Sequence, residues 1–281
     1  MILPIDRCIV LPLRPASPEV FSGIGLALHF LLGNVLVLHT GLEEMWFGWR
    51  VAKIFPRRQD LENYCRDAAV RLDLSRTARE QKVRFWIAGT YTDRSAALAC
   101  FDAESAADGS PIELPLSCDD GLVAFRARFI DGLASAGLAM DAGQARAALW
   151  PETIDPAGLD VVGRALERFY IASKFTNDRP LDPGPFKQAI ATAPDSFMAH
   201  DIYGWALYQN RNYAAARPAF LKSLGINPSG AGAMSGLMWC GVYMQAVDEA
   251  MFWAGRKAEV CGRDVAAARE KGRQRYEKVN R

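Results

Sequence analysis

The sequence predicts an α/β domain with a mixed sheet, built from a βαβ unit and an antiparallel meander, followed by an all-α solenoid of helical repeats. Two patterns support this fold class. In the first half of the chain, short apolar runs alternate with helical periodicity and then give way to strands joined by short turns. In the second half, helical segments recur at one repeat length. With 281 residues, the chain is long enough for both parts.

The first elements are expected to form the βαβ unit. Residues 8–13 are a nearly continuous apolar run, which is typical of a buried strand. Residues 17–19, Ser-Pro-Glu, supply an N-cap, a proline in the first turn and an early acid, so a helix is expected to follow. We expect Gly33-Asn34 to end this helix and residues 35–38 to form a second strand. A strand, a helix and a strand in succession imply a parallel pair.

The next segment is expected to supply a helix over residues 60–72 and then three strands. The strands are predicted at 83–92, 96–104 and 112–117, where runs typical of strands are separated by short turns. Strands joined in this way form an antiparallel meander. Helical periodicity returns at 122–133.

Three short motifs accompany this order of elements. They are Glu19-Val20-Phe21 running into Gly25-Leu26, Ile87-Ala88-Gly89-Thr90-Tyr91 and Phe101-Asp102-Ala103-Glu104. With them, roughly residues 5–140 resemble the TolB amino-terminal-like domain. In bacteria that domain often precedes tetratricopeptide (TPR) repeats, as in CadC-like transcriptional regulators and TPR-bearing adenylate cyclases. The resemblance therefore implies a bacterial signalling or regulatory protein.

Residues 197–230 carry the spacing of one TPR repeat. The marker positions that keep the consensus residue are Gly204, Ala216, Phe220 and Pro228, and those that replace it are His200, Tyr203 and Leu207. Two antiparallel helices can approach closely where small residues lie, so we expect the helices to meet at Gly204 and Ala216. The Phe220 ring is expected to help fill the seam between them.

Neighbouring copies of this repeat are degenerate. Counting one repeat length of about 34 residues in each direction gives units that begin at Gly163 and Ala231. A terminal helix from about Arg263 is expected to cap the stack. The predicted domains are residues 1–140, a linker with an entry helix at 141–162, and TPR-like repeats at 163–281.

Composition and charge limit the classes of function. The formal net charge is +1, which gives no whole-chain electrostatic basis for binding nucleic acid or an anionic membrane. Residues 256–281 hold nine Lys or Arg against four Asp or Glu, so the basic C-terminal helix leaves such a contact open. The six cysteines are scattered without a CxxC pair, as in reduced proteins, and no apolar run is long enough to span a bilayer. A cytoplasmic location is expected.

No catalytic, cofactor-binding or metal-ligating set is expected. Gly23-Ile24-Gly25 lacks the third glycine and the GK[ST] signal of nucleotide-binding loops. His39 followed by Glu43-Glu44 resembles an acid–base or metal cluster, but the three histidines of the chain have no HxH or HxxxH spacing. A GxSxG elbow is absent as well. The sequence therefore predicts a protein that is not an enzyme.

An aromatic segment at 43–56 has two interpretations. Its residues Trp46, Phe47 and Trp49 either form a corner of the core or present a hydrophobic docking patch to a partner.

The leading hypothesis is a non-enzymatic scaffold or adaptor whose TPR groove binds a protein or peptide partner. The first helices of the repeats line such a groove, so the expected contact residues are His200, Tyr203, Tyr208, Gln209 and Met238. Packing of one repeat against the next is the alternative role for these positions. A second copy of the chain is among the partners that a groove of this kind admits.

A second hypothesis is a ligand-responsive regulatory module. Open α/β sheets bind ligands at the carboxyl ends of their parallel strands, which places a small-molecule site near Leu13-Arg14 and His39-Thr40. The TPR part would then relay the signal.

Overall fold

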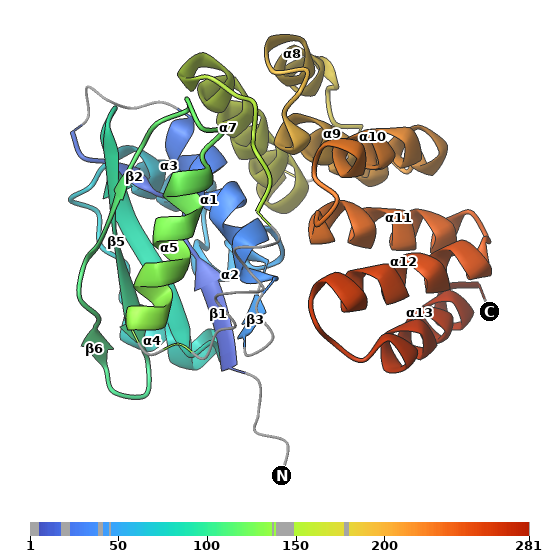
Figure 1. Cartoon of the computed structure of the whole chain (residues 1–281), viewed down its shortest axis with the longest axis horizontal. Helices are drawn as coiled ribbons and strands as arrows, with labels where there is room; N and C mark the ends of the chain where they lie inside the picture. Colours follow the sequence, from blue (N-terminus) through green and yellow to red (C-terminus); the bar gives the residue numbers. More distant parts are fainter. Residues whose placement is uncertain are drawn as a thin grey trace. The chain divides into compact units, whose positions relative to one another are not determined.

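The computed structural model describes residues 6–17, 23–38, 42–44, 46–136, 138, 149–176 and 180–280. The chain forms two compact units, which divide between Asn177 and Asp178 (Figure 1). The first unit contains a mixed sheet with helices, and the second is built from helices. A mixed sheet followed by a run of helices is the coarse fold class that the sequence predicts.

The sheet of the first unit has seven strands. Their order is β3-β1-β4-β5-β6, with β2 beside β4 and β7 beside β5. Strand β1 pairs in parallel with β3 and β4, whereas β5 pairs antiparallel with β4, β6 and β7. The antiparallel meander is therefore confirmed, and β1 has parallel neighbours other than the predicted one at 35–38. The strands are β1 (Asp6–Val10), β2 (Arg14–Pro15), β3 (Leu42–Glu44), β4 (Phe85–Tyr91), β5 (Ser95–Asp102), β6 (Ala107–Asp108) and β7 (Ile112–Pro115).

Two helices, α1 (Ile24–Leu36) and α5 (Val123–Ser135), cover one face of the sheet (Figure 1). Helix α1 lies close to β4, because a Cβ on Gly25 would come within 2.6 Å of the Tyr91 ring. The core sits between this face and these helices, where Tyr91 is 1% exposed. The predicted helix at 122–133 is confirmed.

Helix α1 continues past Gly33-Asn34, so the strand predicted at 35–38 is wrong. Residues 35–36 are still helical and 37–38 form a turn. The Asn34 side chain is buried and its Nδ2 donates to the carbonyl of Phe30 at 3.0 Å, which satisfies the amide within the helix. The parallel partners of β1 come later, as β3 and β4. The predicted start of the helix at 18–22 lies outside the described residues.

Short helices follow β3, and the helix predicted at 60–72 ends early. Asp67 accepts a hydrogen bond from the backbone NH of Ala69 (2.8 Å), a local turn that stops the helix. Asp73 then begins a further helix, because its carboxylate accepts from the backbone NH of Arg76 (2.9 Å). The elements are a 3₁₀ turn (Phe47–Trp49), α2 (Val51–Ile54), α3 (Arg58–Arg66) and α4 (Leu74–Gln81).

Helix α7 (Pro156–Ile171) belongs to the first unit, where it packs along α1. The two backbones touch, because a Cβ on Gly163 would lie 1.7 Å from the carbonyl oxygen of Gly23. The boundary between the units therefore comes after α7 and its extension Ala172–Thr176 in the chain. The sequence had placed a linker at 141–162 and the first repeat from 163.

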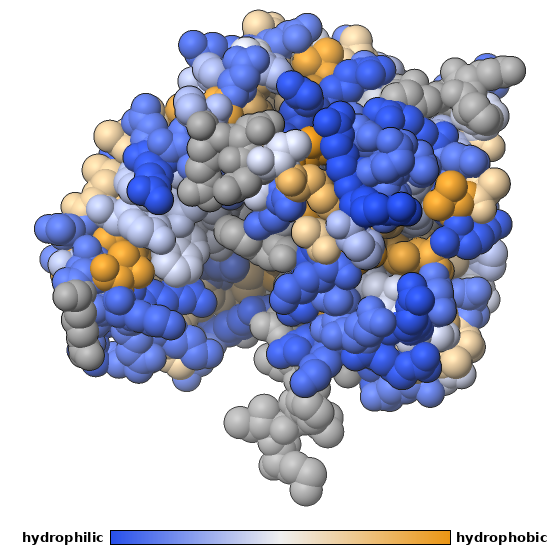
Figure 2. Space-filling model, turned by 180° about the vertical axis from the view of Figure 1, so that it is seen from behind, coloured by the Kyte–Doolittle hydropathy of each residue, from blue (hydrophilic) through white to orange (hydrophobic). Residues whose placement is uncertain are grey.

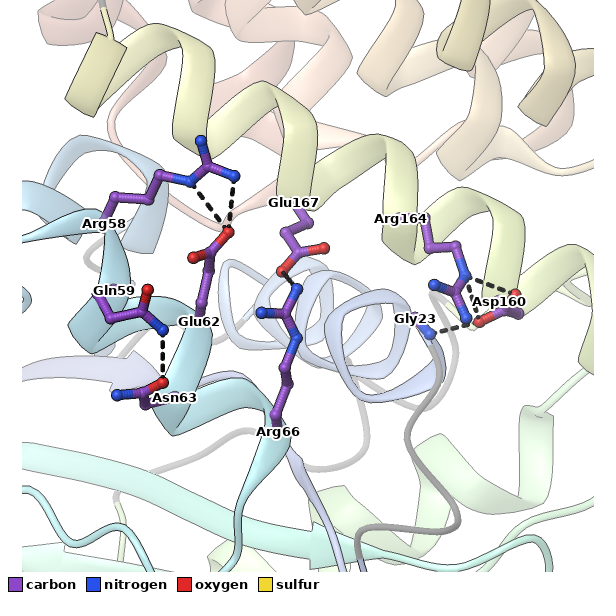
Figure 3. Close-up of polar contacts among 9 residues, drawn as sticks. All are labelled: Gly23, Arg58, Gln59, Glu62, Asn63, Arg66, Asp160, Arg164 and Glu167. Atoms are coloured by element: carbon purple, nitrogen blue, oxygen red, sulfur yellow. Dashed lines mark hydrogen bonds and ion pairs between the residues drawn. The ribbon is translucent and has the colours of Figure 1, made fainter.

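Polar contacts also hold α7 in the first unit (Figure 3). The Asp160 carboxylate accepts from the backbone NH of Gly23 at the start of α1 and pairs with Arg164 (2.8 Å). Glu167 pairs with Arg66 of α3 (3.4 Å). Burial raises the pKa of Glu167, and Arg66 opposes that shift. Helix α7 thus joins α1 to α3.

Arg126 of α5 anchors the segment that leads into α7. Its guanidinium is fully buried and donates to the carbonyl oxygens of Gly121 and Leu122, each at 3.0 Å, and of Trp150. It also lies over the Trp150 ring, 4.6 Å from the ring centroid. Burial lowers the pKa of Arg126 to about 10, so the side chain stays charged near neutral pH.

The second unit contains six helices in its described part. Ser196 caps α9 and Asn212 caps α10, each accepting from a backbone NH three residues on. Helices α9 and α10 form one hairpin, α11 and α12 a second, and α13 packs against both helices of the second hairpin. The helices are α8 (Gly184–Thr192), α9 (Phe197–Gln209), α10 (Tyr213–Ile226), α11 (Ala231–Tyr243), α12 (Val247–Val260) and α13 (Val265–Asn280).

The ring of Phe220 joins the two hairpins. A Cβ on Gly204 of α9 would come within 2.6 Å of this ring, and a Cβ on Gly236 of α11 within 2.3 Å. The ring therefore lies between two helices at positions where only glycine fits. The predicted seam between Gly204 and Phe220 is present, and Gly236 extends it to the next hairpin.

Within the described residues, no helix has both the length and the apolar character needed to cross a bilayer.

Candidate functional site

His200 lies inside the second unit. Its side chain is 8% exposed, and its Nε2 lies 2.8 Å from the carbonyl oxygen of Pro194. Burial lowers the pKa of His200, so the imidazole is neutral near pH 7. His200 thus holds the turn before α9, and the contact role expected for it does not agree with its burial.

Met238 is buried as well. It is 4% exposed, and its Sδ lies 3.3 Å from Nη1 of Arg275 on α13. The Arg275 guanidinium also covers the Trp239 ring, 5.5 Å from the ring centroid. The terminal helix therefore covers the position at which Met238 was expected to meet a partner. Tyr203 and Gln209, the other predicted residues of α9, are half-buried.

Tyr208 is the predicted contact residue that the structure places in an aromatic group near the surface. Its ring centroid lies 5.4 Å from that of Tyr213 and 5.9 Å from that of Tyr243. The Tyr213 and Tyr243 rings stack at 4.8 Å with an interplanar angle of 8°. We call these three residues the tyrosine cluster. Burial raises the pKa of Tyr208, and Tyr243 contributes to the shift, so the phenol is neutral.

The tyrosine cluster forms where the ends of three helices meet. Tyr208 is the penultimate residue of α9, Tyr213 begins α10 and Tyr243 ends α11. Sequence reasoning missed Tyr213 and Tyr243. The repeat register held a signal, because one repeat length of about 34 residues counted forward from Tyr208 reaches the neighbour of Tyr243.

Large hydrophobic side chains reach the surface of the second unit. The four that are exposed in the described chain all lie in the second unit: Tyr243 (40%), Met244 (42%), Phe252 (49%) and Val279 (40%). Asn280 donates its Nδ2 to the carbonyl of Val242 at 2.9 Å, so the end of α13 meets the end of α11. We define the terminal patch as Tyr208, Tyr213, Tyr243, Met244 and Val279. On the face drawn in Figure 2, hydrophilic side chains predominate and hydrophobic areas are small.

The aromatic segment of the first unit lies largely in the core. Phe47 is 1% exposed, and its ring centroid is 5.0 Å from that of His29 and 5.3 Å from that of Tyr170. Trp46 is half-buried and meets Phe30 edge-on at 5.1 Å. Of the two interpretations of this segment, a core corner agrees with these contacts for Phe47 and Trp46. The Trp49 side chain lies outside the description.

Two titratable side chains, those of His29 and Asp201, are buried in the interior of the protein. His29 Nε2 lies 3.0 Å from the Tyr170 hydroxyl, and burial lowers the pKa of His29 to about 3 against a smaller opposing effect of the Val10 backbone. The Asp201 carboxyl is fully buried in α9, one turn before Trp205, and burial raises its pKa to about 8. Both groups are therefore neutral near pH 7.

The basic C-terminal helix is partly neutralised by its own acids. Arg273 pairs with Glu270 at 2.7 Å and with Glu277 at 2.5 Å. Such exposed pairs along one helix contribute little to stability. They do reduce the basic surface that the sequence offers to a polyanion.

Among the residues with described positions, no group of three or more His, Cys, Asp or Glu could hold a metal ion. His39, part of the weak cluster considered from the sequence, lies outside those residues. Comparison with protein-family models finds no matching family, and comparisons with curated proteins and with solved structures likewise find no match.

Proposed function

We propose that the chain is a non-enzymatic interaction scaffold whose helical unit binds a protein or peptide partner through the terminal patch. One observation carries this proposal: every large hydrophobic side chain exposed in the described chain lies in the second unit, and three of the four belong to the patch. Exposed hydrophobic groups beside polar surface are typical of interaction sites.

The kind of repeat supports the proposal. Residues 197–230 carry the TPR spacing in sequence, and Phe220 between Gly204 and Gly236 supplies close packing of the kind that such repeats require. The first unit is proposed to be TolB-like, because its βαβ unit and meander follow the order of elements of that domain. TPR-like arrays present surfaces to partners and supply no chemistry of their own.

The composition of the terminal patch indicates the partner. Tyrosine rings give a large contact area at a low cost in side-chain entropy, and their hydroxyl groups add hydrogen bonds. Met244 adds a flexible apolar side chain that adapts to the shape of a partner. A peptide or protein surface with apolar side chains and exposed hydrogen-bonding groups fits this combination.

A comparison of three forms of the full chain tests the proposal. The double substitution Tyr243→Ser with Met244→Ser removes the exposed part of the patch, whereas Phe252→Ser removes a similarly exposed ring on α12 as a matched control. Crosslinking and co-purification from the native cell should recover a partner with the wild type and with the control but not with the double variant. Equal recovery with all three forms, or no partner with any, would contradict the proposal.

The same variants distinguish a second copy of the chain from a different partner. Sedimentation of the pure protein over a wide concentration range reports self-association. A homo-oligomer that dissociates in the double variant identifies the partner as the chain itself.

A further inference from the structure

The first unit holds a cleft of about 750 Å³ on the face of the sheet that α1 and α5 leave uncovered. Its floor consists of small side chains in two cross-strand pairs, Ala88 with Ala99 and Thr90 with Ala97. All four side chains are half-exposed, whereas Leu98 and Cys100, which alternate with them on β5, are buried. Because side chains alternate between the faces of a sheet, the floor is a shallow surface of methyl groups.

Arg14 lines the cleft at the end of the floor that carries Thr90, because β2 pairs Arg14 with Thr90. The Arg14 side chain is 6% exposed, and its Nη1 donates to the carbonyl oxygens of Ala68 (3.1 Å) and Val70 (2.6 Å). The guanidinium lies over the Tyr64 ring, 5.1 Å from the ring centroid. Arg14 thereby ties the loop between α3 and α4 to the sheet.

Arg14 has no carboxylate partner for its charge among the described residues. Its Nε is buried and has no acceptor within the part of the chain that the structure describes. A buried charge with an unpaired donor is costly unless an anion compensates for it. The charge and the geometry of a guanidinium suit a carboxylate or phosphate group.

The remaining lining residues make one end of the cleft polar and basic and give the other end an aromatic ring and a proline. Arg71 of the loop between α3 and α4 adds a second positive charge, and Ser75 of α4 adds a hydroxyl. Phe101 and Pro111 line it together with Asp108, which pairs with Phe101 across β5 and β6. The floor from Thr90 to the level of Phe101 spans four residues of β4, or about 13 Å at the usual rise of a strand. Asp73 lines the cleft too, but its carboxylate already caps α4.

We propose that this cleft binds a small organic anion with an apolar body, the anionic group against Arg14 and the body over Ala88 and Ala99 toward Phe101. The site goes beyond the scaffold function, which rests on the second unit alone. The cleft includes Arg14, and the second hypothesis from the sequence places a small-molecule site near Leu13-Arg14. The other residues of that hypothesis, His39-Thr40, lie outside the described chain.

Calorimetric titration of the full chain tests the site with three probes. Hexanoate carries the anion and the apolar body, inorganic phosphate carries an anion alone, and hexylamine carries the body with the opposite charge. We expect saturable binding of hexanoate with a Kd on the order of millimolar, as suits a ligand of this size. Phosphate should bind more weakly at the same site, and hexylamine should not bind.

Three variants locate the binding. Arg14→Gln removes the charge and Ala99→Leu fills the floor without touching Arg14, and each should weaken hexanoate binding at least tenfold. Arg128→Gln, an exposed arginine of α5 on the opposite face, is the control and should leave the affinity unchanged. Because Arg14 also ties down a loop, Ala99→Leu keeps the test decisive if the Arg14 variant fails to fold.

Three results would overturn the assignment. The first is the absence of saturable binding of hexanoate and phosphate at tens of millimolar. The second is hexanoate binding that Ala99→Leu leaves unchanged, since the ligand then occupies another place. The third is equal binding of hexanoate and hexylamine, because that would exclude a role for the Arg14 charge.

Discussion

Asp201 should make the second unit less stable as the pH rises. Its carboxyl is fully buried in α9, and its pKa is raised from 3.8 to about 8 by burial. Between these values the folded chain holds a proton that the unfolded chain has lost. Stability is therefore fully present below about pH 4 and decreases as the pH rises toward 8. The slope for one such group is about 1.4 kcal/mol per pH unit, or roughly 4 kcal/mol between pH 4 and pH 7.

The substitution Asp201→Asn isolates this effect, because the amide keeps the shape of the side chain and cannot ionise. Urea unfolding of the full chain at pH 5, 6, 7 and 8, followed by tryptophan fluorescence and far-UV circular dichroism, gives the unfolding free energy of each form. Trp205 lies one turn from the substituted position and reports on this unit. The advantage of the variant over the wild type should grow by about 1.4 kcal/mol per pH unit from pH 5 to pH 7, and by less from pH 7 to pH 8, where the folded carboxyl begins to ionise.

The control is Asp248→Asn, which neutralises an exposed carboxyl in the first turn of α12. That change removes only a favourable contact with the helix dipole, worth about 0.3–1 kcal/mol, and should show no comparable slope. A free-energy difference between Asp201→Asn and the wild type that stays constant from pH 5 to pH 8 would refute the reasoning, since it would mean that the carboxyl is ionised in the folded chain.

Four further substitutions test burial and packing. The first unit of the wild type should lose thermal stability as the pH falls from 6.5 to about 4, because the pKa of His29 is lowered to about 3 and only the unfolded chain takes up a proton there in that range. His29→Phe should reduce this loss. A thermal midpoint that falls with pH as steeply in the variant as in the wild type contradicts this. Gly236→Ala should destabilise the second unit by about 1–3 kcal/mol, since the added Cβ meets the Phe220 ring. Gly225→Ala should instead stabilise this unit by about 0.5–1 kcal/mol, because its added Cβ meets nothing within 4 Å. Urea unfolding measures both free-energy changes. Gly163→Ala should cost more than Gly236→Ala, because the obstructing atom is backbone, and a thermal midpoint of the first unit close to that of the wild type would contradict the packing of α7 on α1.

The sequence pattern was sufficient to predict elements whose structure depends mainly on residues close together in the chain. The meander from Phe85 to Pro115 follows from strand-forming residues and short turns, and the pairing agrees. Helix α1 shows the limit. Almost all of its residues are buried, so no amphipathic pattern marks its end, and a buried Asn34 that satisfies its own amide looks in sequence like a stop signal.

The unit to which a helix belongs depends on long-range contacts, and the hydrophobic periodicity of the sequence does not reveal these contacts. Helix α7 has the periodicity expected of a repeat helix, yet the close approach of Gly163 to Gly23 and the His29–Tyr170 contact place it on α1. Both contacts join residues that are far apart in sequence. A single sequence offers no signal for such pairs.

The candidate sites rest in part on sequence patterns. The sequence selects Tyr208 because it lies in the predicted repeat and Arg14 because it follows a buried strand, and both remain proposals. His200 and Met238 were assigned to a groove, but a backbone carbonyl and the terminal helix enclose them. The cleft floor depends on the register that sets Ala88 against Ala99. That register becomes visible only when the strands are paired.

The placement of the Phe220 ring has a consequence for the folding cooperativity of the second unit. Because one ring fills the space at both Gly204 and Gly236, unfolding of either hairpin leaves the other with an uncovered aromatic surface or an unfilled gap. Coupling between neighbours of this kind makes repeats unfold together. Amide hydrogens of α9 and α11 should therefore exchange through one common opening reaction, with similar protection factors, although the two helices belong to different hairpins.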